Sequence, residues 1–84
     1  MERLHFGIDT ENHLITLTNI KMNKNGFSYN NITFNKVDDN VVEVSYNKIT
    51  PEYSRNCIDA NLQWGLNSII KAIHEYSEMF EFEL

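Results

Sequence analysis

The hydrophobic pattern changes once along the chain, from alternation in residues 1–50 to helical spacing after Pro51. Thr50 suits a helix cap, and Pro51 suits the first helical position. When successive residues are placed about 100° apart, the apolar residues that follow gather on one stripe. The spacing predicts one long helix over about residues 51–80. The stripe comprises Ile58, Leu62, Leu66, Ile69, Ile73, Tyr76 and Phe80, with Ile70 on its flank.

Two features of this helix have more than one interpretation. The tail from Phe80 to Leu84 alternates apolar and acidic residues, so it either stays helical or leaves the helix as a short strand. Gly65 lies within the helix, where glycine costs about 1 kcal/mol relative to alanine. It indicates a mild kink, a close approach by a neighbouring backbone, or loose packing.

The first fifty residues predict an antiparallel sheet. Asn25-Gly26 is the strongest hairpin signal, since both residues accept the positive φ of a type I′ turn. We therefore predict an α+β fold: a four-stranded antiparallel β-meander followed by one long C-terminal helix packed on one face of the sheet. A single domain, residues 1–84, is expected. The strands are expected at about 3–8, 13–23, 27–37 and 41–49.

The predicted turns and the alternation agree on one register. The first loop pairs Ile8 with His13, and the Asn-Gly turn pairs Leu17 with Phe34. The third loop pairs Phe34 with Val44. These pairs keep the apolar residues of all four strands on one side of the sheet, here called the core face. The core face is expected to lie under the helix.

Four apolar residues fall on the opposite face, near the tip of the second predicted hairpin. They are Ile20, Met22, Phe27 and Tyr29. One interpretation is that bulges near residues 18–19 and 30–31 return these side chains to the core. The other is that they form an exposed patch that docks a partner protein or a second copy of the chain.

A second apolar stripe lies on the predicted helix, separated from the first by more than about 100° around the helix axis. It comprises Tyr53, Cys57, Ala60 and Trp64. A helix on a single sheet needs only one buried face, so this stripe either covers a loop or the C-terminal tail, or it meets a partner. Because Trp and Tyr supply large anchors at interfaces, Tyr53 and Trp64 are candidate partner-binding residues.

The charge distribution adds a third candidate surface. Twelve acidic and seven basic residues give a net charge of −5. Acids dominate the C-terminal end, where Glu75, Glu78, Glu81 and Glu83 lie. These glutamates are expected to attract a basic partner, and they would stand in for phosphates if that partner normally binds nucleic acid. The alternative is that the acidic end only keeps a small protein soluble.

Neither catalysis nor a cofactor is expected. Cys57 has no histidine three or four residues away, and the three histidines fall on separate predicted elements. The chain has no phosphate-binding glycine loop and no ligand spacing for a metal. Its seven basic residues are dispersed, which argues against direct nucleic-acid binding. No stretch resembles a membrane span or a signal peptide, so a cytoplasmic protein is expected.

In overall build, a compact acidic chain with a sheet and one long helix, the sequence resembles small phage-encoded inhibitors, including anti-CRISPR proteins, and some toxin-immunity proteins. The resemblance covers build alone and implies stoichiometric occlusion of a larger host protein, without turnover or cofactor. The expected function is therefore a non-enzymatic protein-binding module of a phage or mobile element. The alternatives are a homodimeric structural or immunity protein and, more remotely, a small enzyme that uses Cys57.

Overall fold

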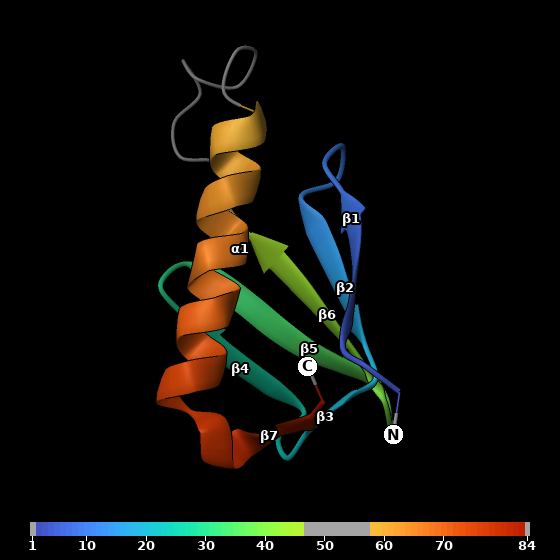
Figure 1. The fold of residues 1–84 in the computed structure, drawn as a ribbon. Helices are drawn as coiled ribbons and strands as arrows, with labels where there is room; N and C mark the ends of the chain where they lie inside the picture. The colour runs from blue at the N-terminus through green and yellow to red at the C-terminus, as the bar shows by residue number, and fades with distance from the viewer. Residues whose placement is uncertain (1, 47–57, 84) are drawn as a thin grey trace.

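The structure is a computed structural model that describes residues 2–46 and 58–83 (Figure 1). The predicted helix start at Thr50 and Pro51 lies outside these residues. The described elements are β1 (His5–Asp9), β2 (Leu14–Thr18), β3 (Ile20–Met22), β4 (Gly26–Tyr29), β5 (Ile32–Asp38), β6 (Val41–Tyr46), α1 (Ile58–Glu75), the 3-10 turn η2 (Ser77–Met79) and β7 (Phe80–Phe82).

The fold is α+β, as predicted: an antiparallel sheet is followed by one C-terminal helix that packs against β5. Within the described residues the sheet has five strands, in the order β1-β2-β6-β5-β4. The strands β3 and β7 form a separate two-stranded ribbon. Figure 1 shows this ribbon near the end of the molecule where α1 ends.

The predicted meander order is wrong, because the chain leaves the sheet after β2. Asn19 has a φ of 63°, a left-handed conformation that asparagine tolerates better than most residues. Its backbone N–H donates to the Asn40 carbonyl (2.9 Å), and its Nδ2 donates to the Arg3 carbonyl (2.8 Å). The residues after Asn19 then form β3, which pairs with β7. As a result, β2 pairs with β6, and not with the strand that follows Asn25-Gly26.

The second hairpin turns five residues later than predicted. Asn30 and Asn31 have φ values of 49° and 65°, the positive values that both central residues of a type I′ turn require. Gly26 has no positive φ and begins β4 instead. This hairpin places Phe27 opposite Phe34, so both side chains lie on the core face.

The predicted register is confirmed for the third hairpin, where Phe34 lies opposite Val44. In the first hairpin Ile8 lies opposite Ile15 instead of His13. The turn has four residues, as predicted, but it lies one residue later, at 10–13, and includes His13, which has a φ of 56°. A shift of two residues preserves the side of the sheet on which each residue lies, so the predicted core face of β1 and β2 is unchanged.

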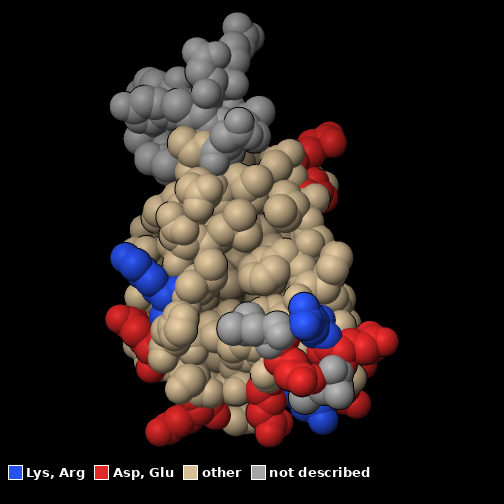
Figure 2. All heavy atoms as spheres, in the orientation of Figure 1, with Lys and Arg blue, Asp and Glu red and all other residues tan. Residues whose placement is uncertain are grey.

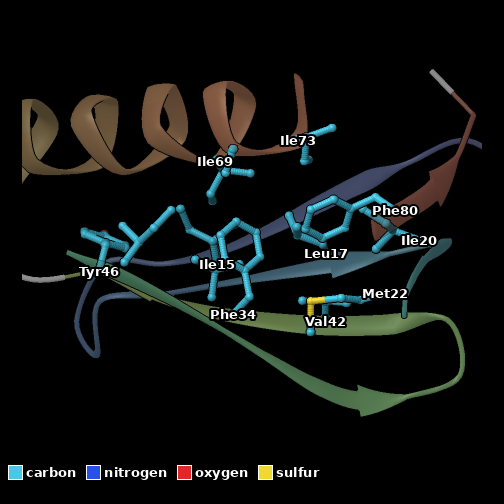
Figure 3. Packing of buried hydrophobic residues seen from close by; sticks show 13 residues of the cluster. Ile15, Leu17, Ile20, Met22, Phe34, Val42, Tyr46, Ile69, Ile73 and Phe80 are labelled. Carbon is cyan, nitrogen blue, oxygen red and sulfur yellow. The ribbon is translucent and has the colours of Figure 1, made fainter. Parts of the chain in front are cut away.

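The core fills the space between the core face and α1 (Figure 3). Ile69 and Ile73 point from α1 toward the strands, and Phe80 reaches in from β7. The buried apolar residues of the described chain are Ile15, Leu17, Ile20, Met22, Ile32, Phe34, Val42, Val44, Tyr46, Ile69, Ala72, Ile73 and Phe80.

The helix approaches the sheet through small residues, and the centre of its buried face differs from the predicted stripe. Gly65, Ser68 and Ala72 are buried, whereas Tyr76 is exposed. A Cβ on Gly65 would lie 3.0 Å from Cγ of Tyr46. Gly65 is therefore a site of close approach, one of the interpretations of its place in the helix, although the neighbour is an aromatic ring and not backbone.

The helix ends at Glu75, earlier than the predicted residue 80. One 3-10 turn follows, and the tail then forms β7 opposite β3. The strand interpretation of the tail is thus confirmed. The period-two pattern has a direct cause, because Phe80 is buried while Glu81, the next residue, is exposed.

Candidate protein-binding groove

The predicted hairpin-tip patch is not an exposed surface. Ile20 and Met22 lie on β3 and are buried in the core, so the prediction that they form an exposed patch is wrong. Phe27 and Tyr29 are half-buried on β4 and pack against the core. The cause is the irregular backbone, a strand break at Asn19 and a turn after Tyr29, in place of the bulges considered for these positions.

Phe27 and Tyr29 belong to a cluster of aromatic rings that joins β4 to the end of the helix. The Phe27 ring centroid lies 4.9 Å from that of Tyr76, 5.6 Å from Phe34 and 6.5 Å from Phe80. The Tyr29 and Tyr76 rings are 5.8 Å apart with an edge-to-face geometry. Such pairs add stability beyond their buried area. These contacts therefore join β4 to β5, to β7 and to Tyr76, the residue that follows α1.

Tyr29 also makes a polar contact that is open to a direct test. Its hydroxyl donates a hydrogen bond to Glu75, which raises the pKa of Tyr29 above its ordinary value of 10.0, and desolvation raises it further. Because the folded-state pKa is raised, this contribution to stability is complete below pH 10 and is lost as the pH rises through the raised pKa. We expect Glu75→Ala to move the pKa of Tyr29 back toward 10.0 in an NMR titration of labelled tyrosines.

The control for this titration is Glu78→Ala, which removes a glutamate that does not contribute to the pKa of Tyr29. The Tyr29 pKa should be the same in this variant as in the wild type. An unchanged pKa in Glu75→Ala would contradict the hydrogen bond.

The second predicted helical stripe is described only in part. Trp64 is half-buried and packs against the core cluster, and Ala60 is exposed. Tyr53 and Cys57 lie outside the described residues. Part of the Trp64 side chain contacts the protein's own core, and partner contacts at Trp64 and at Tyr53 stay predictions.

The four C-terminal glutamates are all exposed, but they do not share one surface. Glu75 ends α1 beside β4, and Glu78 lies in the 3-10 turn. Glu81 lies opposite Lys21 on the β3–β7 ribbon, and Glu83 follows β7. Figure 2 shows acidic side chains spread around this end of the molecule, with basic ones among them, below a broad surface without charges. The acidic side chains thus gather at the end of the molecule where α1 ends, and they do not form one acidic face.

An apolar groove lies between α1 and the edge strand β1, whereas Tyr29 lies on β4 at the other edge of the sheet. The groove has a volume of about 320 Å³. Ile70 on its helical wall is 48% exposed, and Ile8, on the same face of β1 as Phe6, is 49% exposed. The lining residues are Leu4, Phe6, Ile70, Ile73, His74, Ser77 and Phe82.

Sequence reasoning did not identify this groove, although two signals pointed toward it. Ile70 lies on the flank of the predicted helical stripe, where a helix on a wide core would be covered. The first strand also carries Leu4, Phe6 and Ile8 on one face, although it is an edge strand that needs less apolar surface than a central one. Whether Ile70 and the apolar face of the first strand are covered depends on where α1 lies across the width of the sheet.

The described residues do not include a metal centre. No group of three or more His, Cys, Asp or Glu side chains within 2–46 and 58–83 is placed to hold a metal ion. In the same residues, no helix is both long enough and apolar enough to cross a membrane. His74 lines the groove and Cys57 lies outside the described chain, so the structure does not place the two together.

The groove is suited to binding by apolar contact. It has apolar walls from a strand and a helix, and glutamates lie close to its lining residues in the chain. No protein-family model, curated protein or solved structure matches the chain.

Proposed function

We propose that this protein is a protein-binding module that acts without catalysis, by covering a surface of a larger partner. The observation that carries the proposal is the groove between α1 and β1. It has Ile70, a large apolar side chain that is 48% exposed, on its helical wall and Phe6 of β1 on the opposite wall. Contiguous apolar surface of this kind commonly marks an interaction site on a soluble protein.

The acidic end supports the same proposal. Glu78 and Glu83 each follow a lining residue of the groove in the chain, Ser77 and Phe82. Charges at the rim of an interface chiefly speed association and select the partner, while the apolar centre supplies affinity. A small acidic module with one such surface is suited to be an inhibitor that a phage or mobile element encodes. Such an inhibitor would occlude a host protein, and that host protein could be one that binds nucleic acid.

The test is capture of partners from bacterial lysate by the tagged chain. We expect Ile70→Asp to reduce capture at least about tenfold, because it places a charge at the centre of the apolar surface. The matched control is Val37→Asp, which makes the same kind of change at a residue that is 60% exposed on β5 and does not line the groove. The fluorescence of Trp64 and the circular dichroism of each variant report whether it is folded.

Two outcomes would count against this proposal. Equal capture by the wild type and Ile70→Asp would show that the groove is not the contact surface. Sedimentation of the wild type as two chains at micromolar concentration, reduced to one chain by Ile70→Asp, would favour the homodimer.

A further inference from the structure

The strand β1 forms an open edge of the five-stranded sheet. Among the described residues, β2 lies on one side of β1 and no strand lies on the other. Backbone N–H and C=O groups in a row at such an edge are a template for a further strand, and many proteins protect the edge with proline, lysine or a bulge. Residues 5–9 contain neither proline nor lysine, and their register with β2 is continuous. The edge is therefore not protected in these ways.

Two hydrogen bonds show which backbone groups of β2 face β1. The N–H of Tyr46 donates to the His13 carbonyl (3.0 Å), and the N–H of Asn19 donates to the Asn40 carbonyl (2.9 Å). Both contacts are with β6 or the residue just before it, so the odd-numbered residues of this stretch face β6. Because the direction alternates along a strand, the even-numbered residues of β2 face β1.

The same alternation identifies the groups on the open edge of β1. Each even-numbered residue of β2 lies opposite an odd-numbered residue of β1, as Thr16 lies opposite Gly7. The N–H and C=O groups of the odd-numbered residues of β1 therefore face β2. Those of Phe6 and Ile8 face away from it. The open edge thus presents four backbone groups, two N–H and two C=O.

A second copy of β1 matches these four groups in one antiparallel register. A two-fold axis at Gly7 places Phe6 of one copy opposite Ile8 of the other, and all the outward groups of both residues then form hydrogen bonds. A shift of the pairing toward Leu4 would need its N–H, which already donates to the Glu83 carbonyl (2.7 Å). A shift the other way reaches the turn after β1.

The side chains are complementary in the same register. Residues directly opposite one another in an antiparallel pair lie on the same face, so Phe6 of one copy contacts Ile8 of the other on the core face. Ile8 is 49% exposed in the single chain, and this contact covers it. On the opposite face, His5 lies across from Asp9 of the other copy. The Asp9 carboxylate accepts hydrogen bonds from Asn12 and stays exposed, so it can also accept one from His5.

The antiparallel arrangement also limits repulsion between two copies that each have a net charge of −5. β1 begins beside the acidic end of the molecule and runs away from it, toward the turn at 10–13 (Figure 1). Pairing in opposite directions therefore places the two acidic ends at opposite ends of the shared strand pair. The helix α1 packs against β5, away from this edge, so the two helices do not meet there.

We infer that the open edge of β1 binds β1 of a second copy of this chain, in antiparallel register about Gly7, and joins the two five-stranded sheets into one. This inference goes beyond the proposed function and does not depend on it. Opposite residues share a face, so the two α1–β1 grooves open on the same side of the joined sheet. One strand pair makes a small interface, and we expect the dimer to form at about 100 μM and to dissociate on dilution.

Cysteine cross-linking tests the register. Gly7 faces Gly7 of the second copy as a pair without hydrogen bonds, with Cα atoms about 4.5 Å apart, a separation that a disulfide spans. A Cβ on Gly7 would lie 3.6 Å from the Thr16 carbonyl oxygen, an ordinary contact, so cysteine fits. With Cys57 replaced by serine, Gly7→Cys should form a disulfide dimer at least about tenfold faster than His5→Cys, whose two sulfurs would lie roughly 14 Å apart along the strands.

Proline at the two edges of the sheet tests the contact itself. Ile8→Pro removes an outward N–H and leaves the bonds to β2 intact, a change that edge strands tolerate. We expect it to weaken dimerisation at least about tenfold in sedimentation, because two intermolecular hydrogen bonds are lost. Ser28→Pro is the matched control on β4, the other edge. There the Lys36 N–H donates to the Asn25 carbonyl, so Ser28 faces outward, and its variant should dimerise as the wild type does.

Several outcomes would overturn the inference. Sedimentation of the wild type as one chain at about 500 μM would show that the edge does not pair. Cross-linking of His5→Cys as fast as that of Gly7→Cys would exclude the register. A dimer that Ser28→Pro or Ile70→Asp dissociates, while Ile8→Pro does not, would place the contact at β4 or in the groove. Circular dichroism shows whether each variant is folded, and lysate capture that depends on Ile70 would leave the proposed function standing in each case.

Discussion

Replacing Gly65 with leucine is expected to destabilise the protein by about 3 kcal/mol, the upper end of the usual cost of overpacking a core. The Cβ alone would lie 3.0 Å from Cγ of Tyr46 and 3.3 Å from both Cδ atoms. Tyr46 is itself buried, and the His13 ring packs edge-on against it at 5.4 Å, so the ring has little room to withdraw. Thermal or urea unfolding followed by circular dichroism measures the loss.

Gly65→Ala separates the contact from the effect of glycine on the helix. Alanine gains about 1 kcal/mol of helix propensity, which offsets much of the tight contact made by one methyl group. We expect its stability to lie within about 1 kcal/mol of the wild type. A leucine variant as stable as the alanine variant would show that Tyr46 moves aside, and that the close approach of α1 does not depend on glycine.

The contact at Gly65 also explains why the buried face of α1 was only partly predictable. The hydrophobic pattern placed the centre of the face among the largest apolar residues, and Ile69 and Ile73 are indeed buried. A helix comes closest to a sheet where its side chains are smallest, however, so Gly65 and Ser68 are buried too. Side-chain size, which a pattern of hydrophobicity does not include, therefore helps to set the rotation of α1 about its own axis.

Local signals were sufficient for one hairpin and misleading for another. The β5–β6 pairing follows from a short loop and from alternation on both sides of it, and its register agrees with the prediction. The pairing partner of β2, in contrast, depends on a long-range contact. The chain leaves the sheet after β2 because β3 pairs with β7, and the two strands lie about sixty residues apart in the sequence. Asn19 makes the departure possible, but an isolated asparagine does not reveal a positive φ in the sequence.

The groove was not predictable for a related reason. Alternation shows which face of β1 is apolar, and helical spacing shows which residues of α1 are apolar. Neither shows how far α1 sits from β1, because that distance depends on contacts such as Asn30 with Ser68 on the other side of the helix. The glutamates near the C-terminus are exposed, as expected. They are divided, however, between the C-terminal end of α1, the 3-10 turn and the β3–β7 ribbon.

The second large expected effect is at Phe80, the residue through which β7 reaches the core. Phe80→Ala should destabilise the protein by about 3–5 kcal/mol, because it leaves a cavity beside Phe34 and Phe27, whose ring centroids lie 5.5 Å and 6.5 Å from that of Phe80. A domain of this size has a total stability of about 4–13 kcal/mol. The loss is therefore a large fraction of the total, and it should lower the Tm by roughly 4–8 °C per kcal/mol.

Phe82→Ala is the matched control, since it makes the same change two residues later on the same strand. Phe82 is half-buried and lines the groove, so we expect a smaller loss, about 1–2 kcal/mol. Hydrogen exchange then locates each effect: Phe80→Ala should reduce the protection of β3, which pairs with β7, more than Phe82→Ala does. Equal losses would mean that the groove end of β7 holds the ribbon in place as strongly as its core end does. Phe82 would then be a structural residue as well as a wall of the groove, and capture experiments with Phe82 variants would measure folding together with binding.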